Sequence, residues 1–518
     1  MDSHEETSER FSGIGPQTAA ARGGARTAPE SEPQPKPERD PQPKPEPEPQ
    51  PEPGEISVRR VAEPQAPAQA PPTPTQAPPP PTHARPAPTR ERVSALLALG
   101  SAVGVVAFVV ASLTQPGEPT PGATFEATPA SRAVAPGGRI VLTGSEAPES
   151  TPLVLETRSR GAGWRPVGRA TSNGGGGFRL EGRVVGRPGP IAVRARAPGL
   201  AVAAPVRVMV RPLRLASVGD INLGDVPGAA IAANGPRWPW ESAGRWLRGA
   251  EIAFGNLESA VSTRGTPFPK QFNFRGTPAA LAGLRRHSGI DVLNLANNHV
   301  GDYGPQATLD TVRGVERLGM RAVGAGPELR RALAPQVIER MGLRVAFVGF
   351  SNIAPVEFAA TESGPGTAWA TPESIASAVR AARRQADIVV ATFHWGIEKQ
   401  TLESADQRAL ADVAVNAGAQ LVIGAHPHTL QPVRRQGAAL VAYSLGNFVF
   451  GAYSSDTSTT GILEVDVTAE GATAARWRAG EIADGRPLFD GARPRRLPMG
   501  DDLTMETGVH LTGPTSPL

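Results

Sequence analysis

The chain contains no cysteine, so it has neither a disulfide framework nor a thiolate metal site. Any metal that it binds must therefore be held by His, Asp, Glu or Asn side chains. Aromatic residues are also scarce, at 5% of the 518 residues, whereas proline (55) and glycine (58) are abundant. This balance indicates that part of the chain is linker and not packed core. The formal net charge of only +4 at pH 7 argues against a dedicated nucleic-acid binder, so we expect no nucleic-acid partner.

The first 92 residues are polar and of low complexity. Stretches such as "PEPEPQPEPGE" and "QAPPTPTQAPPPPT" cannot build helices or sheet ladders, because proline lacks the backbone N–H that both require. They also contain too little apolar surface to offset the entropy lost on folding. We therefore expect residues 1–92 to be a disordered tail.

A long uncharged apolar run, "VSALLALGSAVGVVAFVVASL", covers residues 93–113. At ~1.5 Å per residue, a helix of this length spans roughly 30 Å, the thickness of a bilayer core. Arg85, Arg90 and Arg92 precede the run and "TQPGEPT" follows it, so the positive-inside rule predicts a cytoplasmic N-terminus and extracellular C-terminal domains. A cleaved signal peptide is disfavoured by the distance from Met1, and a buried soluble helix by the length and flanks of the run.

Residues 124–212 change to short alternating runs punctuated by glycine, such as "GRIVLTG", "PLVLETRS" and "IAVRARA". Strands of this length and spacing predict a small antiparallel, Ig-like β-sandwich. Residues 131–214 carry fourteen arginines against four glutamates, mostly at alternate positions. A solvated sheet face explains this pattern, and a basic domain that touches anionic lipid or polymer is the alternative.

From residue 213 to about 483 the pattern becomes α/β. Apolar strand-like runs, among them "RLASV", "DVLNLA", "DIVVATF" and "LVIGA", alternate with helical patterns such as "PESIASAVRAARRQA". This alternation predicts a layered α/β domain with helices on the faces of a sheet. The last segment, residues 484–518, has no strong periodicity, and we expect it to be irregular.

Polar side chains of the kinds that bind metals follow several of these strands. In sheets of this class, binding sites form where the carboxyl ends of the strands meet. The residues at these ends are Asp220, Asn222 and Asp225, then Asn256 and Glu258, then Asn297, Asn298, His299 and Asp302, then His394 and Glu398, and finally His426 and His428. Four of the eight histidines lie in these loops, a clustering that predicts a shared site.

Each of these residues also has a structural reading. Asp220 could cap a helix, Asn297 and Asn298 could form a turn, and His394 could be a buried core histidine. The pair His426 and His428 is harder to explain in this way, because two imidazoles flanking a rigid proline can face one metal or two adjacent metals. With carboxylates to neutralise the charge, the set could hold two ions about 3.5 to 4 Å apart.

Six ordered stretches of the chain carry a family resemblance. "VGDINLGD", "FGNLESAV", "NLANNHVGDYG", "FHWGIE", "GAHPHTLQPV" and "YSLGNFVF" resemble the signatures of the CapA family, the capsule or poly-γ-glutamate synthesis proteins. Through that family, residues 213–483 resemble the calcineurin-like metallophosphoesterases. The resemblance implies a four-layer αββα metallophosphoesterase-like sandwich, here preceded by the small β-sandwich and the single transmembrane helix. It also implies a divalent metal cofactor of one or two ions, with Mn, Fe or Zn expected.

The resemblance assigns roles position by position. The metal ligands that it implies are Asp220, Glu258, Asn298, His394, His426 and His428. His299 stands in the place of the histidine that meets the phosphate or protonates the leaving group, and Asp302 is expected to orient it. Asn222, Asn256 and Glu398 are expected to contact substrate. Two positions depart from the enzymes, because Asn222 replaces a histidine ligand and Asn256 replaces an aspartate.

Two functional interpretations remain open. In the first, the domain is a surface hydrolase that cleaves a phosphoester or a bond of the polymer with metal assistance. In the second, it is a non-catalytic membrane component that binds the polyanion within a polymer synthesis or export complex. Both imply contact with the membrane, with an anionic polymer or phosphoester, and with synthase or export subunits.

Overall fold

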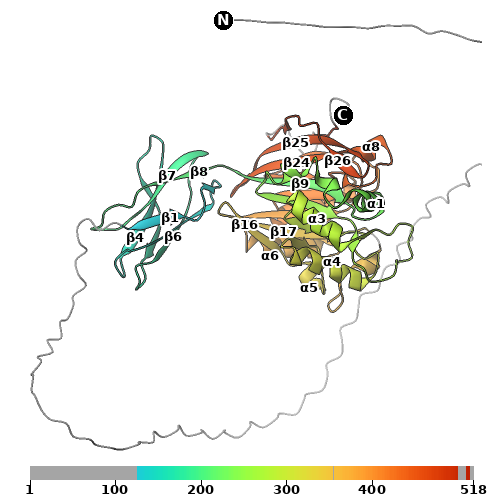
Figure 1. Cartoon of the computed structure of the whole chain (residues 1–518), viewed down its shortest axis with the longest axis horizontal. Helices are drawn as coiled ribbons and strands as arrows, with labels where there is room; N and C mark the ends of the chain where they lie inside the picture. Colours follow the sequence, from blue (N-terminus) through green and yellow to red (C-terminus); the bar gives the residue numbers. More distant parts are fainter. Residues whose placement is uncertain (1–124, 354, 500–508, 514–518) are drawn as a thin grey trace, which may run out of the picture. The chain divides into compact units, whose positions relative to one another are not determined.

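The computed structural model describes residues 125–353, 355–499 and 509–513, which fold into a small β-sandwich and a larger α/β domain (Figure 1). The predicted tail and the apolar run at 93–113 lie outside the described residues. Within the described ranges, no helix combines the length and the apolarity needed to cross a membrane.

The β-sandwich consists of two sheets, with strand orders β1-β3-β6 and β2-β8-β7-β4-β5. All their strand pairs are antiparallel except β2 with β8, which is parallel. Its strands are β1 (Glu126–Pro129), β2 (Ala133–Val134), β3 (Arg139–Ser145), β4 (Pro152–Ser159), β5 (Arg165–Thr171), β6 (Phe178–Arg183), β7 (Gly189–Arg196) and β8 (Val206–Val210). Alternate residues of β6 and β7 are buried, as expected when one face of a strand packs on a core. The core contains Leu142, Leu155, Leu180 and Val193, all with no exposed surface.

Several arginines of the sandwich interact within its own surface. Arg194 and Arg196 both contact the buried carboxylate of Glu156, at 2.8 and 3.2 Å. The guanidinium groups of Arg158 and Arg194 lie over the ring of Trp164, 4.6 and 3.9 Å from its centroid. These contacts account for part of the arginine excess without any partner.

Two sheets form the centre of the α/β domain. The nine-stranded sheet has the order β14-β13-β10-β9-β24-β25-β26, with β23 paired to β9 and β27 paired to β25. The six-stranded sheet has the order β16-β17-β19-β20-β22-β21. The strands of the first are β9 (Leu213–Ile221), β10 (Ile252–Leu257), β13 (Val292–Asn294), β14 (Arg321–Val323), β23 (Asn447–Val449), β24 (Thr459–Thr468), β25 (Gly471–Ala483), β26 (Arg486–Leu488) and β27 (Arg495–Leu497). Those of the second are β16 (Gln336–Arg340), β17 (Leu343–Ser351), β19 (Ile388–His394), β20 (Leu421–Ala425), β21 (Val433–Gln436) and β22 (Ala439–Ala442).

The two sheets pack face to face, and helices cover both outer faces (Figure 1). Between the sheets, the rings of Phe254 and Phe347 stack with centroids 6.0 Å apart. The helices on the nine-stranded sheet are α1 (Asp225–Asn234), α2 (Gly244–Leu247), α3 (Pro278–Ser288) and α4 (Pro305–Arg317), and those on the six-stranded sheet are α5 (Leu329–Ala332), α6 (Pro372–Arg383) and α7 (Ala405–Ala417). The layers therefore run helix, sheet, sheet, helix, which is the order that the family resemblance implies.

Shorter elements complete the domain. They are the strand pairs β11 (Ala260–Val261) with β12 (Arg275–Gly276) and β15 (Ala325–Gly326) with β18 (Gly366–Thr367), the helix α8 (Ser455–Ser458), and the 3₁₀ turns η1 (Trp238–Trp240) and η2 (Val356–Phe358).

Local sequence explains where the main helices begin. Thr371 and Ser404 each form a reciprocal capping box at the start of α6 and α7, and Thr277 caps α3 by accepting a hydrogen bond from the N–H of Ala280. These helices return the chain between parallel strands, so β9, β10 and β13 in one sheet and β17, β19 and β20 in the other each point the same way. Their carboxyl ends carry the residues that were expected to form a site.

The segment after residue 483 differs from its prediction. It was expected to be irregular, yet β26 and β27 extend the nine-stranded sheet by pairing with β25. Each of these strands has three residues, too few to produce a recognisable period of two. The domain therefore continues beyond the predicted boundary.

Candidate metal centre

Two buried carboxylates come from neighbouring strands of the nine-stranded sheet. Asp220 lies near the end of β9 and Glu258 directly follows β10, and both are fully buried. Asp220 Oδ1 accepts a hydrogen bond from Asn256 Nδ2 at 2.8 Å, and its Oδ2 accepts one from the backbone N–H of His426 at 3.2 Å. Glu258 differs, because neither of its oxygens has a hydrogen-bond partner among the described residues.

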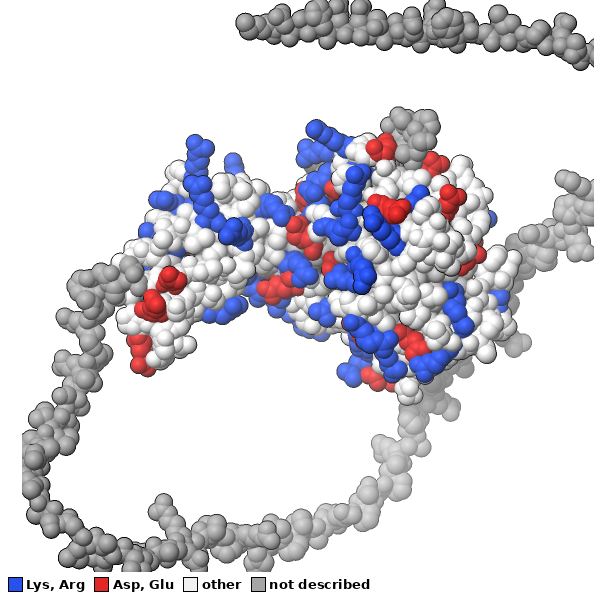
Figure 2. All heavy atoms as spheres, viewed as in Figure 1, with Lys and Arg blue, Asp and Glu red and all other residues white. Residues whose placement is uncertain are grey.

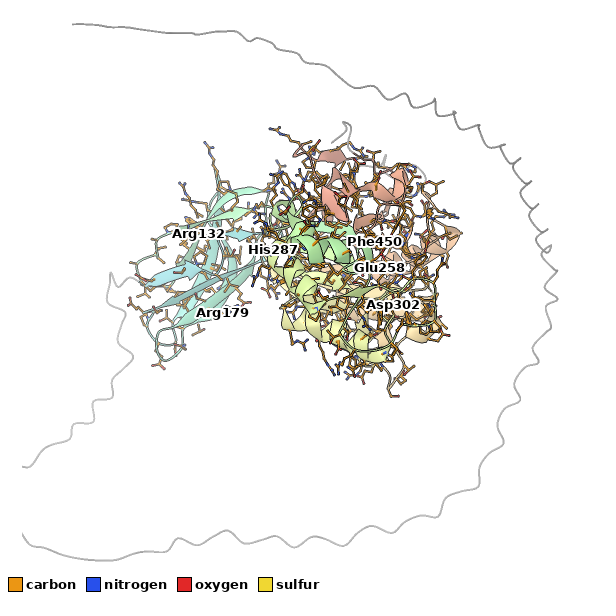
Figure 3. The ribbon with its side chains drawn as sticks, turned by 45° about the vertical axis from the view of Figure 1, so that its right-hand side comes forward. Arg132, Arg179, Glu258, His287, Asp302 and Phe450 are labelled. Atoms are coloured by element: carbon orange, nitrogen blue, oxygen red, sulfur yellow. The ribbon has the colours of Figure 1, made fainter. Side chains whose placement is uncertain are left out.

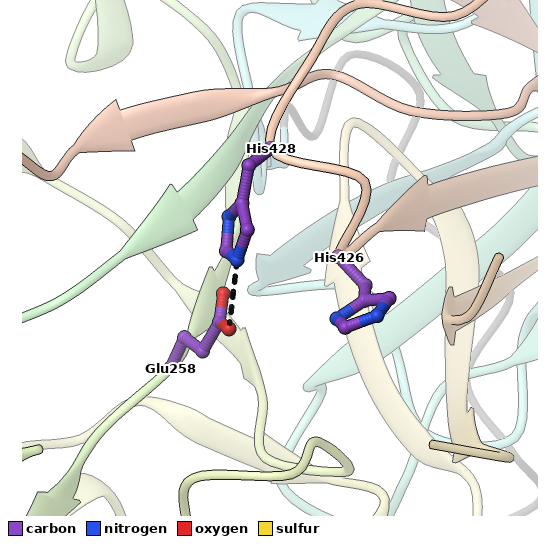
Figure 4. Close-up of side chains that lie close together, drawn as sticks. All are labelled: Glu258, His426 and His428. Atoms are coloured by element: carbon purple, nitrogen blue, oxygen red, sulfur yellow. Dashed lines mark ion pairs between the residues drawn. The ribbon is translucent and has the colours of Figure 1, made fainter. Parts of the chain in front are cut away.

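Three histidines reach the same place from the six-stranded sheet. His394 is the last residue of β19, whereas His426 and His428 follow β20. Glu258 Oε1 lies 3.6 Å from His394 Nε2 and 3.7 Å from His428 Nε2. Figure 4 shows the imidazole of His428 directed at the Glu258 carboxylate, with His426 beside them.

The loop that presents the last two histidines has an uncommon backbone. His426 and His428 adopt φ values of +96° and +59°, in the region that side chains other than glycine rarely occupy. Such strain persists only where the surrounding structure imposes it, and it gathers at functional sites. Here it turns two imidazoles that flank a proline toward the same carboxylate.

A glycine allows the first carboxylate to approach this loop. A Cβ atom on Gly219 would lie 1.8 Å from the carbonyl oxygen of Gly446, so no other residue fits between β9 and the segment before β23. The backbone N–H of Asp220 donates to that same carbonyl at 2.9 Å. Asp220 is thereby fixed next to Asn447, whose Oδ1 lies 2.8 Å from His428 Nδ1.

Burial determines the charge of the cluster. Burial, and after it the charge of Asp220, raises the pKa of the Glu258 carboxyl well above its usual value. Burial lowers the pKa of His394 well below its usual value and lowers the pKa of His426 to about 3. For His428, burial acts downward, but the hydrogen bond and the charge of Asp220 raise the pKa above its usual value. Neutral imidazoles with free ring nitrogens are the form that binds metals.

The side chains form two sets that fit a metal ion. In one, ligand atoms of Asp220, Glu258 and His394 all lie within 4.8 Å of one another, and in the other the same holds for Glu258, His426 and His428. Glu258 belongs to both. Asn298 joins the first set, because its Oδ1 lies 2.8 Å from His394 Nε2. The structure thus brings together every residue that was predicted to bind metal.

The two asparagines before His299 have separate functions. Asn297 Oδ1 accepts hydrogen bonds from the backbone N–H groups of His299 (3.0 Å) and Val300 (2.9 Å), so this residue forms the turn. Its amide also donates to the carbonyl of Leu257 at 2.8 Å. The turn leaves Asn298 and His299 facing the cluster.

His299 is held by a chain of charged groups. Its Nδ1 lies 2.7 Å from Asp302 Oδ2, and Asp302 Oδ1 lies 2.7 Å from Lys270 Nζ. The ring of Phe274 stacks on the imidazole with centroids 4.0 Å apart. His299 Nε2 then faces Glu258 Oε1 at 3.9 Å. Burial lowers the pKa of His299, while Asp302 acts in the opposite direction.

A cavity of about 680 Å³ opens beside the cluster. His299, His428, Asn447 and Phe450 form its inner wall, and Glu398 and Lys399 lie on its rim. Two aromatic side chains that line it, Phe272 and Tyr453, are 60% and 64% exposed. Figure 3 shows Phe450 close to Glu258, with Asp302 on the same side of the domain.

The three residues expected to contact substrate occupy different positions. Glu398 lies at the rim of the cavity. Asn256 is in the centre of the cluster, where its amide contacts Asp220 and lies 3.2 Å from His394 Nδ1. Asn222 is turned to the local backbone, since its Oδ1 accepts a hydrogen bond from the N–H of Gly224 at 2.8 Å. Asn222 therefore holds the local turn, and no hydrogen bond joins its side chain to either ligand set among the described residues.

Two participants were not assigned a place in the site from the sequence. Asn447 sits in the quoted stretch "YSLGNFVF", but nothing in its spacing links it to His428. Lys270 has a side chain that is only 17% exposed and that pairs with Asp302 at 2.7 Å. A lysine in a proline-rich loop gives no local signal of burial.

Comparison with known proteins agrees with this geometry. The model of the family "Bacterial capsule synthesis protein PGA_cap" matches residues 214–452. The "PGA biosynthesis protein CapA" of Bacillus subtilis is 32% identical over 236 residues, which cover 45% of this chain and 62% of the relative. The "Capsule biosynthesis protein CapA" of Bacillus anthracis is 30% identical over 246 residues, 46% of this chain and 60% of the relative.

A third relative comes from another genus. A "Probable polyglutamine synthesis accessory protein" of Mycobacterium tuberculosis is 29% identical over 255 residues, covering 45% of this chain and 66% of the relative. The chain thus spans about three fifths of the length of the first two curated relatives that it matches. Residues 214–452, which contain all the ligand positions described above, form a domain of the CapA family of bacterial capsule synthesis proteins.

Proposed function

We propose that this protein is a membrane-anchored, extracellular, metal-dependent hydrolase of capsule or poly-γ-glutamate biosynthesis, which cleaves a phosphoester or a bond of the polymer. The biosynthetic setting rests on the names of the relatives, which are capsule and PGA biosynthesis proteins. The membrane anchor rests on the apolar run at 93–113 and the arginines before it. The chemistry rests on the cluster around Glu258.

The observation that carries the proposal is the buried, unpartnered carboxylate of Glu258. A carboxyl group in this position must either keep its proton or meet a cation. No Lys or Arg forms an ion pair with it among the described residues, whereas three histidine rings surround it within 3.9 Å. His426 Nδ1 is likewise buried, with no hydrogen-bond partner in the part of the chain that the structure describes. Carboxylate oxygens and neutral imidazole nitrogens together are the donor set of Zn, Mn and Fe.

The ligand sets share one residue. Asp220, Glu258 and His394, with Asn298, would hold one ion, and Glu258, His426 and His428 would hold a second. Glu258 would then bridge the pair, in the place where the enzymes that this domain resembles use an aspartate. A divalent ion bound there polarises a phosphoryl or carbonyl oxygen and activates water as a nucleophile.

The proton-handling residue is His299. The short contact from its Nδ1 to Asp302 fixes the tautomer, so Nε2 is the atom that exchanges a proton with a bound substrate. Lys270 holds Asp302 from the other side, and Phe274 prevents the ring from turning away. This arrangement matches a group that takes a proton from, and returns it to, an oxygen or nitrogen at the reacting bond.

The cavity suits a segment of chain more than a small ion. Its volume of about 680 Å³ lies within the range of pockets for organic ligands. Lys399 supplies a cation at the rim, while Phe272 and Tyr453 offer apolar surface to the hydrocarbon part of a polymer.

The test is to measure metal in the purified full chain by elemental analysis. The parent should contain near-stoichiometric Mn, Fe or Zn, and the double variant His426→Ala/His428→Ala should lose it. His510→Ala, which removes an exposed histidine, is the matched control and should keep the metal. If neither parent nor variant binds metal after reconstitution with excess ion, the hydrolase proposal fails. Metal-loaded protein would then be assayed with a chromogenic phosphodiester and with poly-γ-glutamate, following chain length.

One observation favours a second candidate, a non-catalytic component that binds the polymer within a synthesis or export complex. Asn222 holds a turn, although the first histidine ligand of the related enzymes is expected there. One nitrogen ligand fewer weakens metal binding or catalysis. The relative named as a synthesis accessory protein supports an assembly role. Metal-loaded protein that retains poly-γ-glutamate without shortening it, and that cleaves no phosphodiester, would favour this candidate.

A further inference from the structure

A second large cavity lies on the helical layer over the nine-stranded sheet. It measures about 690 Å³, and its lining includes Arg248 after α2 and Arg285, Arg286 and His287 at the end of α3. None of the described residues that line it carries a carboxylate. Figure 2 shows basic side chains on the face of the domain that carries α3.

Only some of the arginines around this cavity have an acidic partner. Arg286 is exposed and forms no ion pair within the described part of the chain. Arg248 donates to the backbone carbonyl of His287, which fixes its guanidinium beside the cavity. Arg285 donates to the carbonyl of Ile290 at 2.9 Å and reaches Asp291 only at 3.5 Å.

The pKa of His287 reflects the positive charges around it. Burial lowers its pKa first, and the charges of Arg286, Arg237 and Arg248 lower it further. Of these cations, Arg237 contacts Glu241 at 4.0 Å, whereas Arg248 and Arg286 have no acidic partner in the described part of the chain. An anion placed among them would reverse the effect.

A neighbouring cavity extends this basic surface. It measures about 410 Å³, lies between α3 and α4, and shares Leu318 with the first. Arg264 and Arg317 line it, and its single acid, Asp310, is already held by Arg264. Cations from both cavities thus lie along α3 and do not converge on one point.

The basic surface is separate from the metal centre. Helix α3 connects the site edge of the sheet, near Gly276, to the amino end of β13, and its 11 residues span ~16 Å. Figure 3 shows His287 on the side of the domain away from Glu258 and Phe450. The segment that begins at Arg264 also carries Lys270, which contacts Asp302 in the metal centre.

We propose that the two adjoining cavities form a track that binds an anionic polymer chain with a carboxylate on each residue, and so retains a long chain while one segment lies at the metal centre. The proposal rests on the proposed function, since it names the class of substrate held by the same domain. A polycarboxylate fits better than a nucleic acid, because among the described residues the lining of both cavities contains no Phe, Tyr or Trp side chain on which bases could stack.

The track makes binding depend on chain length. A short oligomer reaches only one of the two places, whereas a long chain engages both, and the second contact then forms at high effective concentration. Binding of long chains should also weaken as salt is added, because exposed arginines are screened.

The test uses the full chain and fluorescently labelled poly-γ-glutamate. The double variant Arg286→Glu/Arg317→Glu should bind chains of about 50 residues at least roughly tenfold more weakly, and oligomers of about three residues unchanged. The control Arg380→Glu/Arg384→Glu makes the same change of charge on and just after α6, where both arginines are exposed, and should leave both affinities within about twofold. The milder Arg286→Gln/Arg317→Gln variant covers the case in which charge reversal impairs folding.

Further measurements distinguish failure of the track from failure of the metal centre. The His287 imidazole, followed by NMR, should rise in pKa when the long polymer binds the parent protein. Equal binding of long chains by the track variant and by the control would overturn the track, and metal content measured in the same samples would show whether the metal centre stands independently. Loss of binding to polyphosphate but not to poly-γ-glutamate in the variant would also overturn the assignment to a polycarboxylate.

Discussion

Two buried glutamates of the nine-stranded sheet have opposite surroundings. Glu464 on β24 is 5% exposed and meets Arg478 at 3.2 Å and Arg476 at 3.4 Å. Glu258 after β10 is fully buried, and its ion-pair contacts among the described residues are all to histidines, none closer than 3.6 Å. The first carboxylate has its cations within the fold, so its function is structural. The second is surrounded by groups that bind a cation but do not provide one, which is the arrangement of a binding site.

This difference shows how a structural buried acid can be told from a functional one. Burial alone does not distinguish a structural acid from a functional one, since both cost free energy to remove from water. The chemical nature of the partners does. Arginine is always charged and completes a pair, whereas His394 and His426, whose pKa values are lowered by burial, leave neutral lone pairs for a metal.

The largest expected effect comes from breaking the paired glutamate. Glu464→Gln leaves Arg478, whose side chain is 8% exposed, without its countercharge, and should lower the free energy of unfolding by about 3–5 kcal/mol. Denaturant unfolding measures this. Glu481→Gln on β25, an exposed acid, is the control and should change stability by less than about 0.5 kcal/mol. A loss at Glu464 no larger than at Glu481 would contradict the structural function.

The unpaired glutamate should behave in the opposite way. Without metal, Glu258→Gln should unfold at the same or a higher denaturant concentration than the parent, because it removes a buried acid that no cation meets. With metal at about 100 times its dissociation constant, the parent should gain about 2.7 kcal/mol, and the variant should gain almost nothing. Thermal or denaturant unfolding with and without metal gives both numbers, and an equal gain in the variant would remove Glu258 from the ligand set.

Metal affinity should depend on pH through the same group. Because the pKa of Glu258 is raised, its carboxyl keeps its proton to a higher pH than an ordinary glutamate does, and a metal bound there would displace that proton. Affinity should therefore rise with pH until the pH exceeds that raised pKa. One proton corresponds to about 1.4 kcal/mol per pH unit. Calorimetry in buffers of different ionisation enthalpy counts the protons, and Glu258→Gln should release about one fewer.

The smallest effect is expected at an exposed pair. Arg264, followed by Ser262, lowers the pKa of Asp310 to about 2 against the opposing effect of burial. A lowered carboxyl pKa contributes stability that is present above its usual value of 3.8 and is lost as the pH falls toward about 2. Since the pair is exposed and screened by solvent, Asp310→Asn should cost only about 0.5 kcal/mol at neutral pH. Parent and variant should then converge below pH 2 in acid unfolding, and a larger difference there would point to another cause.

Much of the α/β domain is predictable because its central strands are buried on both faces. Runs such as "DIVVATF" and "LVIGA" are continuously apolar, and they correspond to β19 and β20. Helix α6 begins at Pro372, the first residue of the quoted pattern "PESIASAVRAARRQA", because proline follows the capping Thr371 there. Helix α7 begins after the capping Ser404 without a proline. Helix α3 was not identified, because its three consecutive basic residues interrupt the apolar period.

The sequence predicts which residues form the candidate site better than it predicts how their side chains are arranged. Motif spacing brought Asp220, Glu258 and His428 into one hypothesis, and the structure places them in contact distance. Spacing does not show that Asn222 turns toward Gly224, or that Asn447 reaches His428 across 19 residues of sequence. Those contacts depend on the packing of two sheets and on the strained loop at His426, and no local pattern encodes either.

The hydrogen bond from the backbone of His426 to Asp220 joins residues 206 positions apart. The carboxylates belong to one sheet and the imidazoles to the other, so neither half of the domain holds a complete ligand set. As the chain is made from its N-terminus, Asp220 and Glu258 exist long before the histidines that complete their surroundings. On the proposed function, metal uptake would therefore mark the moment at which the two sheets have docked. In refolding experiments, metal capture should report the last event and not the first.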